Sequence, residues 1–200
     1  MANILVLNSS VLGEGSASRM LVDEAVKRLL QANPGATAIH RDLGSEPIPH
    51  LTTSTVAGVR GVATTNAELA ARRLSDELIA ELRSADTIVI GAPMYNFSIP
   101  TGLRAWFDYV LRAGETFSYS EAGPKGLLSD KRVIVIESRG GLYSEGPAKA
   151  IDFQEPYLRT LLGFIGLNDV TFIHAEKIGF GVDAREAALA SAKQALARAA

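Results

Sequence analysis

Apolar and polar residues follow two alternating patterns along the chain. Short apolar runs have the length and composition of strands that are buried on both faces of a sheet. These predicted strands cover residues 3–8, 36–39, 87–92, 132–138 and 170–175. Between them, apolar residues recur at helical spacing, which predicts amphipathic helices. The predicted helices cover residues 17–31, 66–83, 101–112, 153–164 and 184–199.

Three segments add detail to this pattern. In residues 115–126, Phe117 and Tyr119 alternate with polar residues and turn residues follow, which predicts a hairpin or another excursion from the sheet. Residues 44–65 show neither pattern and receive no assignment. In the first helix, the apolar residues at helical spacing are Met20, Leu21, Ala25, Leu29 and Leu30.

The succession of strands and helices predicts the fold class. Five strand–helix units indicate an α/β fold with a parallel sheet, helices on both faces and right-handed crossovers. The chain has 200 residues, of which 47% are hydrophobic. Since that length and composition suffice for one sizeable core, we expect a single domain over residues 1–200.

Composition narrows the chemistry. The chain has no cysteine, which excludes disulfides, thiolate metal sites and a cysteine nucleophile, so redox chemistry would require a cofactor. The net charge is −2 and there is no basic run, so nucleic acid is not an expected partner. No stretch reaches the roughly 18 apolar residues that a membrane helix needs, and no secretory signal pattern is present. We expect a soluble, cytosolic protein with small-molecule partners.

Ligands of open parallel sheets bind beyond the carboxyl ends of the strands, so the loops after the first, third and fourth strands are the candidate site. The first loop places Ser10, Ser16 and Ser18 around the start of a helix, where free amides and the helix dipole favour an anion such as a terminal phosphate. It lacks the glycine pattern of dinucleotide folds and of nucleotide triphosphate loops. The alternative is that Ser16 or Ser18 is only a helix cap.

The second loop, Pro93-Met94-Tyr95-Asn96-Phe97-Ser98-Ile99-Pro100, places three large side chains beside an amide at a strand end. A flat heteroaromatic ring needs apolar surfaces on its faces and hydrogen-bonding groups at its polar edge, and this segment offers both. The alternative is a hydrophobic loop that packs under its neighbours.

The third loop is Glu137-Ser138-Arg139-Gly140-Gly141, of which Ser138 to Gly141 are the candidate binding residues. Adjacent glycines let the backbone approach a ligand closely, and their amides can face negative charge that develops on a reduced ring. Arg139 either supports that charge or forms a solvent-facing salt bridge. For the two glycines alone, a plain turn is the alternative.

Taken together, these loops resemble those of the FMN-dependent NADH-azoreductases, also described as NADH:quinone oxidoreductases, and the resemblance covers essentially the whole chain. Its most specific pieces are PMYNF at 93–97 and SRGG at 138–141, with LNSSVLGEGSAS near the start. The resemblance implies a flavodoxin-like fold with strand order 2-1-3-4-5. The segment at 142–155 is longer than the family pattern, which predicts a reshaped pocket mouth.

The resemblance also implies where FMN binds. The phosphate would contact Ser10, Ser16, Ser18 and the backbone of Ala17. Residues 93–97 would wrap the isoalloxazine ring, and residues 138–141 would contact its pyrimidine side. The family forms homodimers with flavin sites at the interface, so Tyr119 and Phe164 are candidates for a substrate channel built by either subunit.

The implied mechanism is ping-pong. NADH or NADPH gives a hydride to FMN and leaves, and a quinone or azo compound then takes its place and accepts two electrons. The flavin carries the chemistry, so no catalytic side chain and no metal site are expected. His40, His50 and His174 lie outside the three loops and are predicted to be structural or solvated. Arg60 is a candidate for influencing the choice of dinucleotide.

Two other functions compete with this interpretation. A flavodoxin-type electron carrier would pass single electrons to protein partners, but such carriers are markedly acidic, whereas this net charge is only −2. A hydrolase could use Ser10 or Ser16 as its nucleophile, but neither lies in a Gly-x-Ser-x-Gly elbow. Both alternatives are therefore disfavoured.

Overall fold

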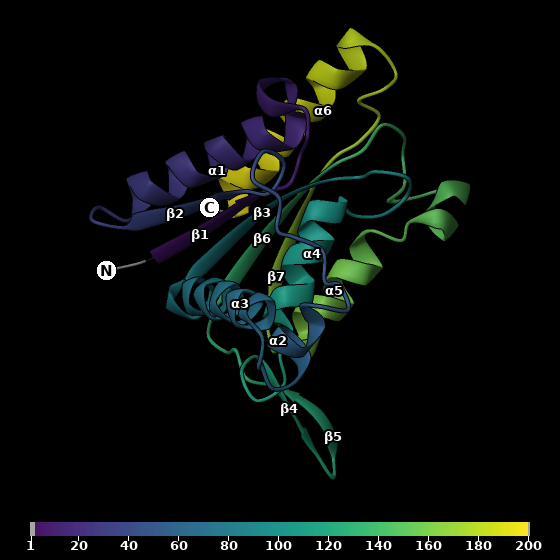
Figure 1. Ribbon diagram of the computed structural model, residues 1–200. Coiled ribbons are helices and arrows are strands. Elements are labelled where there is room, and N and C mark those ends of the chain that lie inside the picture. The colour runs from purple at the N-terminus through teal and green to yellow at the C-terminus, as the bar shows by residue number, and fades with distance from the viewer. Residues whose placement is uncertain (1–2, 200) are drawn as a thin grey trace.

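A computed structural model describes residues 3–199 and shows a parallel sheet at the centre of the molecule (Figure 1). The sheet has five strands in the order β2-β1-β3-β6-β7, which confirms the predicted order of 2-1-3-4-5. Its strands are β1 (Asn3–Asn8), β2 (Thr37–Asp42), β3 (Thr87–Pro93), β6 (Arg132–Ser138) and β7 (Asp169–Ala175). Three residues of the predicted domain range, 1, 2 and 200, lie outside the described part.

Helices cover both faces of the sheet (Figure 1). The helices α1 (Ala17–Ala32) and α6 (Val182–Ala199) pack on one face. The other face is covered by α3 (Asn66–Ser84), α4 (Thr101–Val110) and α5 (Glu155–Phe164). Successive side chains of a strand point to opposite faces, so Ile4 and Val6 join the first core and Leu5 and Leu7 the second. None of the described helices is long and apolar enough to cross a membrane.

The predicted hairpin is confirmed as β4 (Phe117–Ser120) paired antiparallel with β5 (Gly123–Gly126). It lies beside the start of β6 and β7, because Leu128 donates a hydrogen bond to Ile165 in the turn that precedes β7. The hairpin is therefore at the opposite end of the sheet from the three candidate loops (Figure 1). Two short 3-10 helices, η1 (Gly13–Gly15) and η2 (Pro147–Ile151), interrupt the loops after β1 and β6.

Several predicted boundaries differ from the structure, two of them in β2 and α5. The second strand was expected at 36–39, but β2 continues to Asp42, which pairs with Asn8. Its later residues are polar because β2 is an edge strand with exposed positions. The helix expected to begin at about Phe153 begins at Glu155, with Gln154 as its N-cap residue, and the Asp152 carboxylate accepts hydrogen bonds from the amides of Gln154 and Glu155 just before it.

The expected apolar positions of α1 are only partly buried. Leu21, Ala25 and Leu29 face the core together with Val22 and Val26, whereas Met20 and Leu30 are exposed. The helices expected at 101–112 and 184–199 end at Val110 and begin at Val182, respectively. In α1, packing against the sheet buries Val22 and Val26 and leaves Met20 and Leu30 exposed.

The unassigned region contains α2 (Val56–Arg60), which packs closely against α3. A Cβ atom on Gly58 would lie 2.2 Å from the carbonyl oxygen of Glu68. Gly58→Ala should therefore force the two helices apart and destabilise the protein by about 1–3 kcal/mol in chemical denaturation.

Gly163→Ala is the matched control for Gly58→Ala. A Cβ atom on Gly163, in α5, would meet only Asn168 Oδ1 at 3.8 Å. That change should leave stability unchanged or raise it by about 0.5–1 kcal/mol, because alanine favours helix. Equal behaviour of the two variants would contradict the close packing of α2 on α3.

Candidate active site

The first loop forms a cradle of buried hydroxyls at the start of α1. Ser16 is the helix N-cap, where its side chain accepts a hydrogen bond from the Arg19 amide. Its Oγ also lies 3.1 Å from Ser18 Oγ, and Ser10, Ser16 and Ser18 are all buried. The amides of Ala17 and Ser18 occupy helix positions that have no acceptor within the helix. The predicted cap is confirmed, and the same geometry leaves amides and hydroxyls for an anion.

The second loop is a tight turn that contains no glycine. Tyr95 and Ser98 exchange two backbone hydrogen bonds of 2.9 and 3.1 Å. Between them, Asn96 and Phe97 adopt φ angles of 49° and 70°, a left-handed conformation that is uncommon for residues other than glycine. Both side chains are exposed and project from the edge of the sheet. Local strain of this kind clusters at ligand sites, because the surrounding structure must hold it in place.

Hydrogen bonds join the three loops into one surface. The Tyr95 hydroxyl lies 3.3 Å from Ser10 Oγ and accepts a hydrogen bond from the Val11 amide. The Met94 amide donates a 2.8 Å hydrogen bond to Ser138 O, which continues the pairing of β3 with β6 beyond the strands. The predicted residues of all three loops are therefore brought together at the carboxyl edge of the sheet.

The third loop exposes backbone at Gly140 and Gly141. A Cβ atom on Gly140 would meet nothing within 4 Å, so there is open space above this residue. At Gly141, the same atom would lie 3.1 Å from the ring of Tyr143. The Tyr143 ring in turn contacts Phe97 edge to face, with centroids 6.2 Å apart. Tyr143 thus lies between Gly141 in the third loop and Phe97 in the second.

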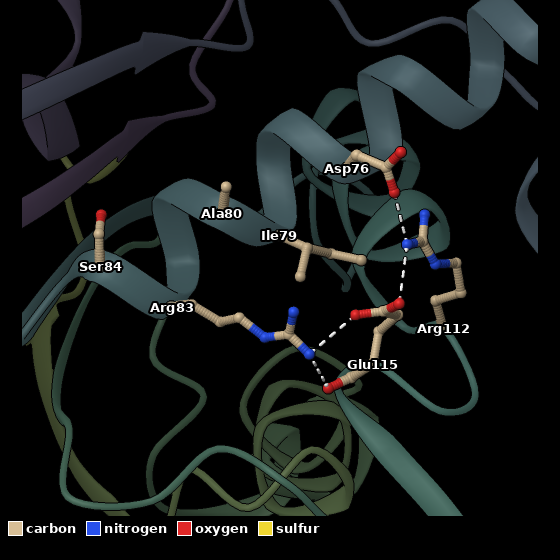
Figure 2. A pocket seen from close by; sticks show the side chains of 7 residues that line it. All are labelled: Asp76, Ile79, Ala80, Arg83, Ser84, Arg112 and Glu115. Carbon is tan, nitrogen blue, oxygen red and sulfur yellow. Dashed lines mark hydrogen bonds and ion pairs between the residues drawn. The ribbon is translucent and has the colours of Figure 1, made fainter.

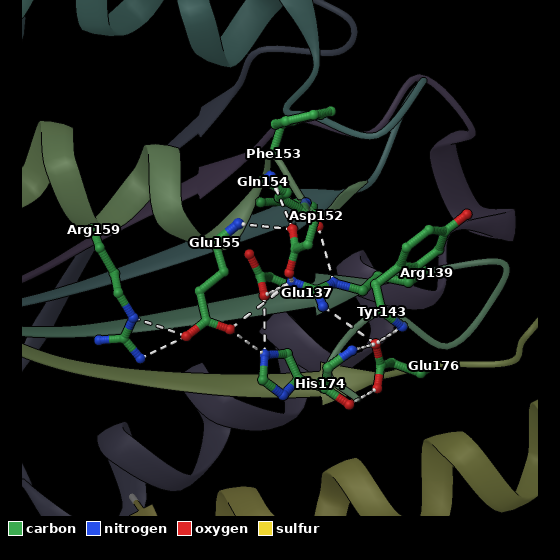
Figure 3. Close-up of polar contacts among 12 residues, drawn as sticks. Glu137, Arg139, Tyr143, Asp152, Phe153, Gln154, Glu155, Arg159, His174 and Glu176 are labelled. Carbon is green, nitrogen blue, oxygen red and sulfur yellow. Dashed lines mark hydrogen bonds and ion pairs between the residues drawn. The ribbon is translucent and has the colours of Figure 1, made fainter. Parts of the chain in front are cut away.

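Arg139 faces the interior of the protein. Its side chain is 0% exposed, so the expected solvent-facing salt bridge is wrong. The guanidinium pairs with Glu137 at 2.6 Å, Asp152 at 3.0 Å and Glu176 at 3.2 Å (Figure 3). Its Nε donates to Gln154 Oε1 at 3.1 Å. Contact between Arg139 and a flavin stays a prediction. In the structure, the Arg139 side chain fixes the third loop to the protein interior through these ion pairs and hydrogen bonds.

His174 belongs to the same network, which supports the prediction of a structural role. Its Nε2 lies 3.1 Å from Glu137 and 2.9 Å from Glu155 (Figure 3). The hydrogen bond with Glu137 raises the pKa of His174, while burial raises the pKa of Glu137 itself. Burial also opposes ionisation of Glu155, but hydrogen bonds from Arg159 and His174 outweigh it and lower the pKa of Glu155. His40 and His50 are exposed.

The network could be mistaken for a metal site. Glu137, Glu155 and His174 offer ligand atoms that all lie within 4.8 Å of one another. However, the Arg139 guanidinium already places a positive charge 2.6 Å from Glu137. The arrangement therefore fits a buried ion-pair network in which arginine is the cation.

Sequence reasoning did not select the other members of this network as site residues: Glu137, Asp152, Gln154, Glu155 and Glu176. A usable signal existed for Glu137, because it is a carboxylate inside an otherwise apolar strand and would require a buried partner. The pairing of Glu137 with His174 follows from the register of β6 and β7, which the sequence does not reveal.

Tyr119 and Phe164 lie far from the three loops of their own chain. Tyr119, in the hairpin, is 73% exposed. Phe164 is half-buried at the end of α5, and its ring centroid is 4.6 Å from that of Phe117. Neither residue can line a channel at the carboxyl edge of the same subunit, so a role for them at that edge requires a second subunit.

A separate depression lies between α3 and the segment after α4 (Figure 2). It has a volume of about 480 Å³ and is lined by charged groups that pair with one another. Arg112 pairs with Asp76 at 2.5 Å and with Glu115 at 3.3 Å, and Arg83 pairs with Glu115 at 2.8 Å. Because these charges are neutralised locally, the depression has the character of an ion-paired surface.

The carboxyl edge fits FMN by the chemistry of its groups. The buried cradle at Ser10, Ser16 and Ser18 suits a phosphate, and the strained turn presents an amide and an aromatic side chain toward solvent. Open backbone at Gly140 suits a polar ring edge. These three features are joined by hydrogen bonds in one surface, as a ligand with a phosphate at one end and a flat ring at the other requires.

Comparisons with known proteins identify the family of the chain. A family model described as "Flavodoxin-like fold" matches residues 2–200. An FMN-dependent NADH:quinone oxidoreductase from Hyphomonas neptunium is 67% identical over 198 residues, covering 99% of this chain and 95% of that protein. A protein of the same name from Ralstonia nicotianae is 50% identical over 196 residues, covering 96% and 94%. The crystal structure of an azoreductase from Bacillus anthracis matches with a TM-score of 0.90 and 28% identity, covering 100% of this chain and 98% of that one. The chain therefore belongs to the flavodoxin-like family of FMN-dependent NADH:quinone oxidoreductases.

Proposed function

We propose that this chain is an FMN-dependent enzyme that moves two electrons from NADH or NADPH to quinones and cleaves azo compounds reductively. It would act as a single domain over residues 1–200 and as a soluble, cytosolic homodimer. One observation carries the proposal. Hydrogen bonds join the serine cradle, the strained turn with Phe97 and the loop with Gly140 and Gly141 at one edge of the sheet.

Each loop has a distinct task in this proposal. Ser10, Ser16 and Ser18, with the amides that begin α1, would bind the phosphate. Residues 93–97 would hold the ring between apolar surfaces and provide hydrogen bonds at its polar edge. The amides of residues 138–141 would stabilise negative charge on the pyrimidine side of the ring. When bound, FMN supplies the chemistry of accepting a hydride and passing two electrons on, so this chain's groups bind and orient.

An absorbance experiment tests the function directly. The purified protein with FMN is reduced anaerobically with NADH and then mixed with a benzoquinone, while the flavin band near roughly 450 nm is followed. We expect the band to bleach with NADH and return with the quinone, at rates well above those of free FMN. Binding of FMN without bleaching would favour the electron carrier, and absence of binding would contradict the site.

The distribution of exposed apolar groups supports the homodimer. Val11, Phe97 and Phe153 surround the candidate loops and are 68%, 43% and 58% exposed. Groups of this kind mark surfaces that a ligand or a second subunit covers. Tyr119 is also exposed, at the opposite end of the sheet. A dimer in which the hairpin of one subunit approaches the carboxyl edge of the other would use both surfaces.

Mixed dimers test whether Tyr119 acts across the interface. One subunit carries Ser16→Asp, which places a negative charge in its phosphate cradle, and the other carries Tyr119→Ala. The mixed dimer has one site with an intact cradle and an intact Tyr119 from the partner. We expect quinone reduction at roughly half the wild-type rate, whereas each homodimer falls at least about tenfold. A mixed dimer no more active than two impaired homodimers would place Tyr119 in its own subunit's site, and a Tyr119→Ala homodimer with wild-type activity would place Tyr119 outside the site.

A further inference from the structure

One buried side chain links the two loops that are proposed to face the flavin ring. Gln154 is 0% exposed and lies directly before α5. Its Nε2 donates a 2.7 Å hydrogen bond to Ala92 O, immediately before the turn at 93–97. Its Oε1 accepts a 3.1 Å hydrogen bond from Arg139 Nε in the third loop. Gln154 thus links two segments that come from different strands.

Neighbouring contacts make this link rigid. The Gln154 side chain makes no cap hydrogen bond at the start of α5. Asp152 accepts hydrogen bonds from the amides of Gln154 and Glu155 and also pairs with Arg139 at 3.0 Å. The Phe153 amide donates a 3.0 Å hydrogen bond to Phe97 O, inside the strained turn. The segment 152–154 therefore contacts Ala92 and Phe97 on one side. On the other side, Asp152 and Gln154 both contact Arg139 of the third loop (Figure 3).

The far side of Arg139 is fixed as well. Its Nη1 pairs with Glu176 at 3.2 Å, and Glu176 accepts hydrogen bonds from the amides of Tyr143 and Ser144. Hence the backbone after Gly141 is connected through Glu176 and Arg139 to Gln154. A change at Gln154 can reach both loops without touching a ligand.

We propose that Gln154 is a positioning residue that sets the separation of the loops 93–97 and 138–141 and thereby the fit of the flavin ring. This inference rests on the proposed binding of FMN at these loops. Gln154 is buried and would not contact the ring itself. It holds the left-handed turn and the glycine pair in the arrangement that accepts the ring. Preorganisation of this kind lowers the cost of ordering the site when the ligand binds.

The test uses Gln154→Met, which keeps the length of the side chain and removes both hydrogen bonds. Ser75→Ala is the matched control, because Ser75 is also fully buried, donates to Tyr109 O and accepts from Arg112 at the opposite end of the sheet. Both variants should lose comparable stability without ligand. Hydrogen exchange in ligand-free protein should accelerate at 93–98 and 138–145 in Gln154→Met alone.

With FMN, Gln154→Met should bind about 10- to 100-fold more weakly, as the loss of one or two buried hydrogen bonds predicts. The midpoint potential of the bound flavin should also shift, a readout that general destabilisation does not move. Ser75→Ala should match the wild type in both. Unchanged loop exchange and FMN affinity in Gln154→Met would overturn the proposal. Equal losses of FMN affinity in Gln154→Met and Ser75→Ala would overturn it as well. If the wild type itself fails to bind FMN, the proposed function fails. The exchange data in ligand-free protein still test whether Gln154 holds the two loops in place.

Discussion

Ser16→Asp is expected to weaken FMN binding by about 100- to 1000-fold. Ser16 is buried at the N-cap of α1, beside Ser18 and the first amides of the helix. Two like unit charges about 4 Å apart repel by about 4 kcal/mol at an effective dielectric constant of about 20. Each 1.4 kcal/mol corresponds to about a factor of ten in affinity. Fluorescence titration of FMN into the ligand-free protein measures the change.

Ser16→Asn is the control that separates charge from capping. Asparagine, aspartate and serine are all good N-cap residues, so helix α1 should keep its stability in both variants. The neutral variant should lose less than about tenfold in FMN affinity, and both should unfold within about 1 kcal/mol of the wild type when no ligand is present. Similar FMN affinity of the two variants would show that the phosphate does not bind at this cradle.

Arg139→Met is expected to destabilise the ligand-free protein by about 3–5 kcal/mol. The substitution removes the cation that pairs with Glu137, which is 0% exposed. Loss of one partner leaves an uncompensated buried charge, and that is the costly way to break a buried ion pair. Thermal unfolding should show a midpoint lower by roughly 6–20 °C for a chain of this size.

The double variant Arg139→Met with Glu137→Gln tests the cause of that loss. The second substitution removes the unpaired charge and keeps a polar side chain facing His174, whose Nε2 lies 3.1 Å from Glu137 in the wild type. We expect it to recover about half of the lost stability. A single variant that loses less than about 1 kcal/mol, or a double variant that is no more stable than the single one, would contradict a buried charge balance at this point.

Much of the fold could be predicted because its signals are local. Buried strands such as β3 and β6 are continuous apolar runs, and strand–helix alternation admits few topologies. The boundaries that failed depend on pairing or packing. Polar residues of β2 are strand because Asn8 pairs with Asp42, and Met20 is exposed because the sheet contacts a different face of α1.

The candidate site, too, could be predicted only where its signals are local. The sequence was sufficient to locate the serine-rich, aromatic and glycine-containing loops, because each carries unusual residues at a strand end and all strand ends of a parallel sheet meet at one edge. It could not place Arg139 in the interior or bring Glu137, Gln154, His174 and Glu176 around it. Those contacts depend on strand register and on the path of the segment before α5, since they join residues far apart in the chain whose side-chain directions are set by packing.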